Sequence, residues 1–350
     1  MIGNKKGSSV LAELPKGITK PEDILKVIFN FALNNTSTIQ SFITRDGNPI
    51  AVHPYQALET LQIHGDFSDI LTPIDSFLNH LDKKKIKRFC IIRTYALGDI
   101  LMLVPVIRAL RKQGYDPFLR TVNEWRPILD LLDIEMEDKR HTFRFVDWGV
   151  NLDGTLEQDH FRPILSEIHR VEIYFIALGI KKMPKKLDWG LDLEKLPKVD
   201  IEGDYICFQG AGSTKMKKLP SESINYIKER FKEKGINVVM IGEGNKKSAR
   251  RLFAIIKGAK CLICMDSAPL WISHFTKTPV IALLGPTRAS ERLSKHPLYP
   301  DRAVGIALNK EIDCENCFES TKKCNGEVDC LKVRPERIWE LIYPEVEKWL

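Results

Sequence analysis

The sequence predicts an α/β protein with two doubly wound parallel sheets. Three observations support this prediction: the length, the alternation of apolar strands with amphipathic helices, and one strand–loop–helix segment at 89–111. The chain has 350 residues, which is enough for two domains that each bury a core. Strands that alternate with helices are typical of parallel sheets covered by helices on both faces.

The segment 89–111, FCIIRTYALGDILMLVPVIRALR, begins the first domain, which we predict at 83–190. Residues 89–92 are apolar, as in a strand buried on both faces. A polar turn follows, and apolar residues then recur at helical spacing, with Pro105 at a kink or a late helix start. Asp99 therefore lies between a strand's carboxyl end and a helix start, where open α/β sheets bind ligands. An N-cap role for the same carboxylate is the structural alternative.

Periodicity and turn residues predict the remaining elements. In the first domain they are strands at 116–121 and 142–147 and helices at 125–132 and 169–179, before a linker at 181–198. In the second domain, 200–333, they are strands at 205–208, 238–241, 261–265 and 280–284 and helices at 220–233, 246–257 and 269–275. A final helix lies in 334–350. Residues 1–82 form an N-terminal extension for which acceptor binding, subunit contact and a structural cap all stay open.

Composition narrows the class of protein. Hydrophobic residues make up 43% and charged residues 28% of the chain, as in soluble globular proteins. No apolar run reaches the roughly 18 residues of a spanning helix, and the first residues lack a signal-peptide core, so we expect a cytoplasmic protein. The net charge of +7 suits phosphorylated substrates or an anionic membrane face. The short lysine runs lack interleaved aromatic residues, so we expect no nucleic-acid partner.

Two segments of the second domain are suited to a diphosphate, although the chain has no Walker loop and no complete G-x-G-x-x-G. The first is 209–220, QGAGSTKMKKLP, in which small residues such as Gly212 admit backbone amides to an anion and Ser213 and Lys217 add a hydroxyl and a charge. A lysine-rich surface loop is the alternative reading. The second is 266–269, where a strand gives way to a helix whose first turn holds a proline.

Four cysteines form the clearest spacing pattern, C-x2-C-x6-C-x5-C. In a cytoplasmic chain such a cluster favours a metal over disulfides, and four thiolates suit tetrahedral zinc or iron in a structural role. The predicted ligands are Cys314, Cys317, Cys324 and Cys330. The other cysteines, 90, 207, 261 and 264, fall in predicted strands and are expected to be core residues.

Three of these features together resemble the bacterial heptosyltransferases, glycosyltransferase family 9, which use ADP-heptose. The pattern I-I-R-T-x-x-L-G-D-I-x-x-x-x-P-x-x-x-A-L-R at 91–111 looks like the family's opening. The segment 261–287, CLICMDSAPLWISHFTKTPVIALLGPT, is similar to its nucleotide-site signature. The cysteine loop resembles the iron-binding members that act on autotransporter proteins. The likeness covers residues 89–340 and implies a GT-B fold, with two Rossmann-like domains facing across a cleft and the last helix crossing back to the first.

The resemblance implies a role for each matching residue. Asp99, beside Gly98, would be the general base that accepts the proton of an acceptor hydroxyl, and Lys217 would stabilise the departing diphosphate. Asp266 would contact the donor sugar. The remaining donor contacts would come from Gly98, Gly212, Ser213, Glu243, Ser267, Ala268 and Pro269. No catalytic metal is expected.

Three departures from the family pattern bear on the donor. Ala268 replaces a glycine, and Trp271 replaces a histidine. Between 238 and 261 there is room for only one strand and one helix, so the second domain is shortened by one βα unit. Glu243 is a candidate for the acid that binds the ribose.

We therefore predict an inverting glycosyltransferase that transfers a sugar, by resemblance heptose, from a nucleotide sugar to a glycan or protein hydroxyl. The alternative is a catalytically weakened GT-B relic that acts as a metal-containing binding protein. Peripheral contact with the inner membrane face and oligomerisation stay open.

Overall fold

A computed structural model describes residues 78, 81–82, 85–94, 96–138, 149–152, 169–178, 180, 183–242, 249–312, 314 and 327–350. Within these residues, no helix combines the length and the apolar character needed to cross a membrane. The predicted strand at 142–147, together with Glu243, Cys317 and Cys324, lies outside the described residues.

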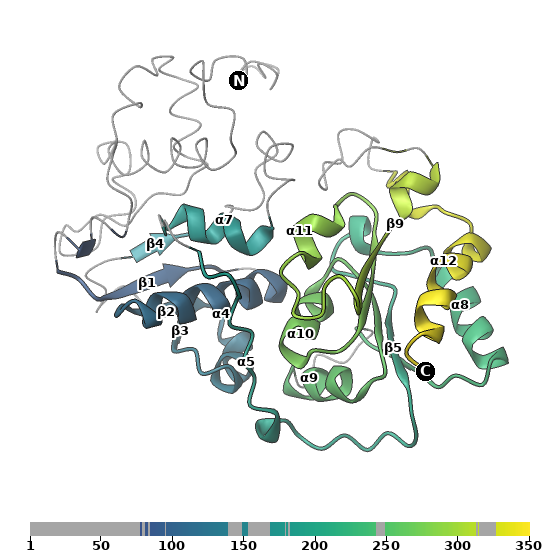
Figure 1. Ribbon diagram of the computed structural model, residues 1–350, viewed down its shortest axis with the longest axis horizontal. Helices are drawn as coiled ribbons and strands as arrows, with labels where there is room; N and C mark the ends of the chain where they lie inside the picture. The colour runs from purple at the N-terminus through teal and green to yellow at the C-terminus, as the bar shows by residue number, and fades with distance from the viewer. Residues whose placement is uncertain are drawn as a thin grey trace, which may run out of the picture. The chain divides into compact units, whose positions relative to one another are not determined.

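The first sheet contains four parallel strands in the order β3-β2-β1-β4 (Figure 1). The strands are β1 (Arg88–Ile92), β2 (Asp116–Thr121), β3 (Met136–Asp138) and β4 (Gly149–Asn151). The predicted strands at 89–92 and 116–121 are thus confirmed. The accompanying helices are α4 (Leu97–Lys112), α5 (Arg126–Leu131) and α7 (Arg170–Ala177), each close to its predicted range.

Helix α4 begins directly after the turn that follows β1. Ala96 precedes it with a φ of 54°, and Asp99 is the third helical residue, in the first turn. The N-cap alternative for Asp99 is therefore wrong, and so is a late helix start, because Pro105 lies inside the helix. The residues at helical spacing that face the core are fully buried: Ile100, Leu101, Leu103, Val104, Ile107 and Leu110.

The second sheet contains five parallel strands in the order β6-β5-β7-β8-β9. They are β5 (Ile206–Gln209), β6 (Val238–Met240), β7 (Leu262–Met265), β8 (Val280–Leu284) and β9 (Ala303–Ala307). The helices are α8 (Ser221–Glu233), α9 (Ala249–Gly258), α10 (Ala268–Thr276), α11 (Ala289–Leu293) and α12 (Pro335–Glu347). Figure 1 shows helices on both faces of this sheet, as expected for a doubly wound fold. Four of the strands were predicted, and β9 was not.

The strand order creates a switch point between β5 and β7. From β5 the chain first adds β6 at one edge and then crosses to β7 on the other side of β5. In such sheets the crevice at the carboxyl ends of the two central strands binds ligands. Between β6 and β7 the described residues contain a single helix, α9, and the shortening by one βα unit stays a prediction.

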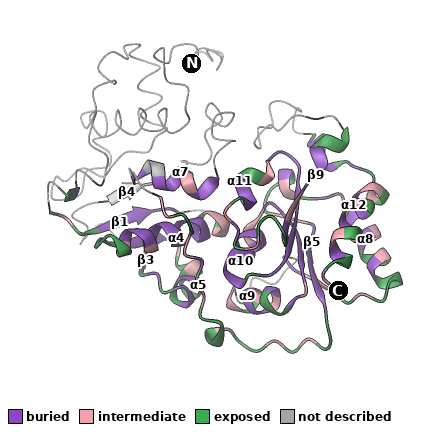
Figure 2. Ribbon diagram, in the orientation of Figure 1, coloured by how far each residue is buried: buried purple, intermediate pink, exposed green. Residues whose placement is uncertain are grey.

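The core of the second sheet continues into the last helix. The inner strands β5, β7 and β8 are buried, as Figure 2 shows for β5, whereas the edge strands β6 and β9 are partly exposed. Ile338, Ile342 and Val346 of α12 are fully buried and belong to the same hydrophobic cluster as the sheet residues. Phe231 of α8 and Trp339 of α12 meet edge to face, with ring centroids 4.8 Å apart. Helix α12 thus packs onto α8, and its crossing to the first domain stays a prediction.

The chain forms two compact units. One comprises the described residues of Met1–Tyr95, Pro105–Asn123 and Glu135–Lys185, and the other comprises those of Ala96–Val104, Glu124–Ile134 and Lys186–Leu350. The start of α4, including Gly98 and Asp99, therefore belongs to the same unit as the second sheet. The predicted domain boundaries stay a prediction.

Candidate functional site

One buried side chain joins the two segments at the switch point. Gln209 ends β5 and is 4% exposed. Its Oε1 accepts a hydrogen bond of 2.7 Å from the hydroxyl of Ser267, which follows β7, and its Nε2 donates to the carbonyl of Ala211 at 2.6 Å. Sequence reasoning missed Gln209, although a polar residue that ends a buried strand at a ligand-binding edge was a usable signal.

The loop after β5 folds back on itself through its glycines. Gly212 N donates to the carbonyl of Lys217 at 2.5 Å, and Ala211 pairs with Lys218 in an isolated antiparallel bridge. A Cβ atom at Gly212 would lie 2.6 Å from Cβ of Lys217, closer than real Cβ contacts. Gly212, which we predicted to let an anion reach the backbone amides, is therefore also required by the packing of the loop.

Two buried apolar side chains anchor this loop and distinguish its lysines. Met216 and Leu219 lie in the hydrophobic cluster of the second unit, on either side of the half-buried Lys217. Lys215 and Lys218 are exposed, as is Ser213. Both Lys217 and Lys218 lie between these two anchors, so the backbone of each is fixed. Lys217 differs in that its side chain is half-buried and its carbonyl accepts from Gly212 N.

The start of α10 leaves its first-turn amides without a side-chain cap. Ser267 is the N-cap residue and has an extended backbone, with φ of −152° and ψ of −177°. Its hydroxyl does not bond to the helix, because it donates to Gln209 instead. Pro269 follows in the first turn. Pro269 has no N–H, and the N–H of Leu270 donates to the carbonyl of Ser267 at 3.0 Å. An anion at this helix start would therefore be favoured by the N–H of Ala268 and by the helix dipole.

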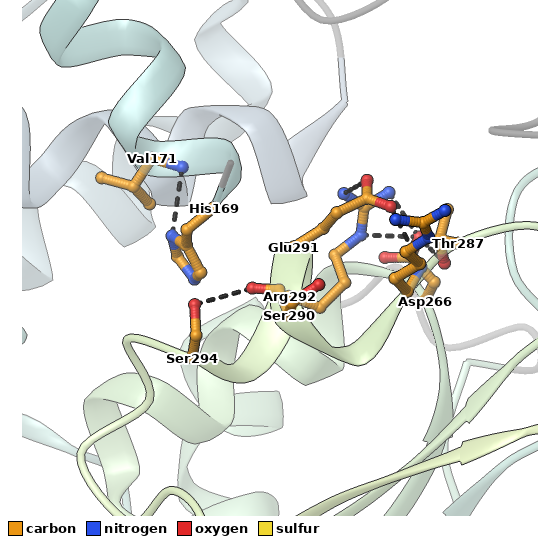
Figure 3. A network of polar contacts seen from close by, with 9 residues as sticks. His169, Val171, Asp266, Thr287, Ser290, Glu291, Arg292 and Ser294 are labelled. Carbon is orange, nitrogen blue, oxygen red and sulfur yellow. Dashed lines mark hydrogen bonds and ion pairs between the residues drawn. The ribbon is translucent and has the colours of Figure 1, made fainter. Parts of the chain in front are cut away.

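Asp266 lies at the carboxyl end of β7 and takes part in a buried ion pair (Figure 3). Nε and Nη2 of Arg292 lie 2.7 and 2.6 Å from its Oδ2, and the hydroxyl of Thr287 donates to the same oxygen at 3.1 Å. Glu291 accepts from Arg292 Nη1 at 3.4 Å. The partners of Asp266 come from the segment after β8, and the sequence carries no local pattern that predicts them.

Gly98 lies against the start of α10. A Cβ atom at Gly98 would be 3.0 Å from Cδ1 of Trp271 and 3.8 Å from Cα of Ala268. Asp99 is the next residue, is partly exposed, and its backbone N–H donates to the carbonyl of Ala96 at 3.0 Å. The structure therefore brings together the Leu-Gly-Asp turn and the helix start that were predicted separately.

Trp271 fills a buried position among other aromatic rings. It is 3% exposed and stacks on Trp189, with centroids 6.4 Å apart and planes at 27°. The ring of His274 stacks on it at 5.0 Å. Because these rings are closely packed, the start of α4 can approach α10 only with a residue as small as Gly98 at this position.

The first unit has two buried arginines at the carboxyl edge of its sheet that sequence reasoning missed. Arg93, directly after β1, is 1% exposed, and its Nη1 donates to the carbonyl of Leu152 at 3.4 Å. Arg120, near the end of β2, is 4% exposed, and its carbonyl accepts from the backbone N–H of Arg93 at 3.1 Å. They add positive charge to an edge where parallel sheets hold ligands.

The cysteine loop can be judged from its two ends. Cys330 is 4% exposed, Cys314 is partly buried, and both pack against the core of the second unit. Asn309 holds Cys314 in place: its Nδ2 donates to the Cys314 carbonyl at 2.7 Å, and its own carbonyl accepts from Cys314 N at 2.8 Å. The 3-10 turns 308–312 and 329–331, which flank the loop, contact each other.

Two of the four predicted ligands lie in the described chain, so the metal site stays a prediction. Across the described ranges, no group of three or more potential ligand side chains comes together. The cysteines expected in strands are core residues, as predicted: Cys90, Cys207, Cys261 and Cys264 are all fully buried. Burial raises the pKa of the Cys261 thiol to about 12, which makes it an inert side chain at neutral pH.

No protein-family model matches the chain, and no curated protein sequence does. Several solved structures resemble it, among them the following two. The iron-containing dodecameric glycosyltransferase TibC from enterotoxigenic E. coli H10407 is 14% identical and has a TM-score of 0.52, over 75% of this chain and 77% of that one. A family 9 glycosyl transferase from Veillonella parvula DSM 2008 is 15% identical and has a TM-score of 0.52, over 75% of this chain and 98% of that one.

At such low identity the similarity defines the fold. The chain has the α/β fold with parallel sheets that is found in these glycosyltransferase structures. This agrees with the fold class that the sequence predicts.

Proposed function

We propose that this protein is a glycosyltransferase that transfers a sugar, with inversion, from an ADP-heptose-like nucleotide sugar to a hydroxyl of a glycan or a protein. One observation carries the proposal: the start of α4, with Asp99, lies against the start of α10 at the switch point. At the same place, Gln209 hydrogen-bonds both to the start of α10 and to the lysine-containing loop. A carboxylate, a helix start and a positioned lysine are the groups that an inverting transfer needs. The GT-B arrangement with a cleft between the domains is part of the same proposal.

In this mechanism the carboxylate of Asp99 accepts the proton of the acceptor hydroxyl as that oxygen forms a bond to the anomeric carbon. The bond from the anomeric carbon to the diphosphate breaks on the opposite face, and its electron pair goes to the diphosphate oxygen. Lys217 and the start of α10 stabilise the charge that develops there. The dipole of α4 favours the ionised form of Asp99 and so weakens it as a base, which exclusion of water around the bound substrates offsets.

The proposal includes a structural metal in the cysteine loop. Cys314 and Cys330 fit such a site, because their backbones are fixed at the two ends of a loop whose flanking turns touch. The thiolates of the four cysteines would hold iron or zinc, and TibC is described as iron-containing. The metal would brace the loop and takes no part in the transfer.

The experiment is a donor screen with ADP, GDP and UDP sugars, read by release of the free nucleotide and by thermal shift. We expect one donor class to raise the melting temperature and to be turned over. Asp99→Asn should keep the thermal shift and lose about 100-fold or more in turnover. Asp301→Asn, at an exposed acid outside the site, is the matched control.

Two results would count against the proposal in different ways. Turnover by Asp99→Asn within a few-fold of the unmodified protein would remove the general base from the mechanism. A thermal shift without any turnover would favour the binding-protein alternative. A cytoplasmic location stays a prediction.

A further inference from the structure

Arg292 has no role in the proposed transfer, yet it makes a buried ion pair with Asp266 at the candidate site. Its side chain is 4% exposed and that of Asp266 is 7% exposed. Charges that are removed from water to this extent are strongly destabilising when one partner is lost. Because this pair lies at the ligand-binding end of β7, we infer that it has a role in addition to stabilising the sheet.

The geometry of the pair fixes one oxygen of the carboxylate. Nε and Nη2 of Arg292 both reach Oδ2 of Asp266, at 2.7 and 2.6 Å, and Thr287 donates to that same oxygen. Three donors that converge on one oxygen set the rotation of the carboxylate about its Cβ–Cγ bond. The position and direction of Oδ1 are then determined as well.

The arginine is itself held rigidly. It lies in the short helix α11, whose start is closed by Glu291, which accepts from Arg288 N at 3.0 Å. Helix α11 packs on β9 so closely that a Cβ atom at Gly305 would come within 2.6 Å of Cβ of Ala289. The guanidinium therefore has a fixed position from which to orient Asp266.

The charges of this group favour hydroxyl donors. Asp266 and Glu291 are acids and Arg292 is the cation between them, so the trio carries one net negative charge when all three are ionised. An ionised carboxylate only accepts hydrogen bonds, and sugar hydroxyls donate them. Ser267 follows Asp266 directly and belongs to the phosphate side of the site, so the carboxylate lies next to the place where a diphosphate would bind.

We propose that Arg292 is the positioning residue for recognition of the donor sugar: with Thr287 it fixes the carboxylate of Asp266 so that Oδ1 accepts hydrogen bonds from hydroxyls of the sugar. This inference rests on the proposed function, in which Asp266 contacts the donor. Arg292 acts on the sugar through Asp266 and contributes nothing to the nucleoside or the diphosphate.

The test compares the affinities of the full-length protein for ADP and for ADP-heptose, measured by calorimetry. The unmodified protein should bind ADP-heptose more tightly than ADP. Arg292→Lys keeps the charge and loses the fork that reaches Oδ2 twice, so it should lose most of this preference, about 10-fold, while its affinity for ADP stays within two-fold. Thr287→Val should reduce the preference in the same direction by a smaller factor, and Arg302→Lys, at an exposed position, should not change it.

A purely structural role would give a different pattern. If Arg292 only stabilised the fold, both affinities would fall together in Arg292→Lys, and that result would overturn the inference. A sugar preference that survives in both Arg292→Lys and Thr287→Val would overturn it too, while leaving the proposed function in place. If the unmodified protein binds neither ADP nor ADP-heptose, the proposed function fails and this inference fails with it. Steady-state kinetics provide a second readout: a changed orientation of Asp266 should raise KM for ADP-heptose more than it lowers kcat.

Discussion

His296 is a buried histidine whose hydrogen bonds admit only its neutral form. It is 4% exposed, its Nδ1 accepts from the backbone N–H of Leu298 at 3.0 Å, and its Nε2 lies 3.1 Å from the hydroxyl of Ser273. That hydroxyl donates to the carbonyl of Leu270 at 2.6 Å. A backbone N–H can only donate, so Nδ1 carries no proton, and the proton on Nε2 is donated to Ser273. A second proton on Nδ1 would face the N–H of Leu298.

Burial lowers the pKa of His296 from 6.5 to about 3, because the charged imidazolium loses its hydration. The unfolded chain binds the proton below pH 6.5, whereas the folded chain stays neutral down to about 3. Stability is therefore lost as the pH falls from about 6.5 towards 3, and it is fully present above that window. At pH 5, about 1.5 units below the unfolded value, the loss from this one residue is about 2 kcal/mol.

The assay is urea unfolding at pH 7.5 and pH 5.0, followed by tryptophan fluorescence. Trp189 is a suitable reporter because its ring packs on His274, whose ring centroid lies 4.4 Å from that of His296. In His296→Gln, the difference in unfolding free energy between the two pH values should be smaller by about 2 kcal/mol than in the unmodified protein. Lys295→Gln, at the neighbouring position, should keep the full difference. Equal pH dependence in His296→Gln and the unmodified protein would refute the reasoning.

Two further predictions concern Gly98 and the cysteine loop. Gly98→Ala places a methyl group 3.0 Å from Cδ1 of Trp271, so the start of α4 or the indole must shift by a few tenths of an ångström. We expect the rate of nucleotide release to fall about 10-fold. The melting temperature should change little, since alanine favours the helix. Adding Trp271→Phe should restore part of the activity, and full activity of Gly98→Ala would contradict the close contact. Elemental analysis of the purified protein should find stoichiometric iron or zinc. Chelation or Cys314→Ser should remove it and lower the melting temperature, and protein that is metal-free yet equally stable would contradict a structural role.

The elements that the sequence predicts well are those with a strong local pattern. The strand at 280–284 has the predicted limits, because five successive apolar residues can only be buried on both faces. Strand β9 was missed because its sequence, AVGIA, has a central glycine, which weakens a strand pattern. Gly305 is needed there for the close approach of Ala289. The reason for the glycine is a tertiary contact, which periodicity cannot reveal.

The residues of the candidate site also divide into those with a local sequence pattern and those without one. Asp99, Lys217 and the 266–269 segment were predicted from turn chemistry and resemblance, because each lies in a strand–loop–helix unit that local rules describe, and their roles stay predictions. Gln209 and Arg292 were missed, since they act on partners 58 and 26 residues away in the chain. A buried hydrogen bond over such a separation has no local pattern, so only the folded chain identifies the residues that hold the site together.

If the second domain lacks one βα unit, as the sequence predicts, the elements that form the switch point are still present. A further strand would extend the sheet beyond β6, the edge strand, whereas the crevice lies at the ends of β5 and β7. The bonds from Gln209 to Ala211 and Ser267 join the two segments that follow these strands, and none of them involves β6. The nucleoside end of a donor would instead depend on the residues that follow β6, where the ribose contact was predicted. A missing unit should therefore weaken the contacts to the nucleoside more than those to the diphosphate. In the donor screen, the nucleoside diphosphate of the one active donor class should still bind without its sugar, and loss of that binding would contradict the argument.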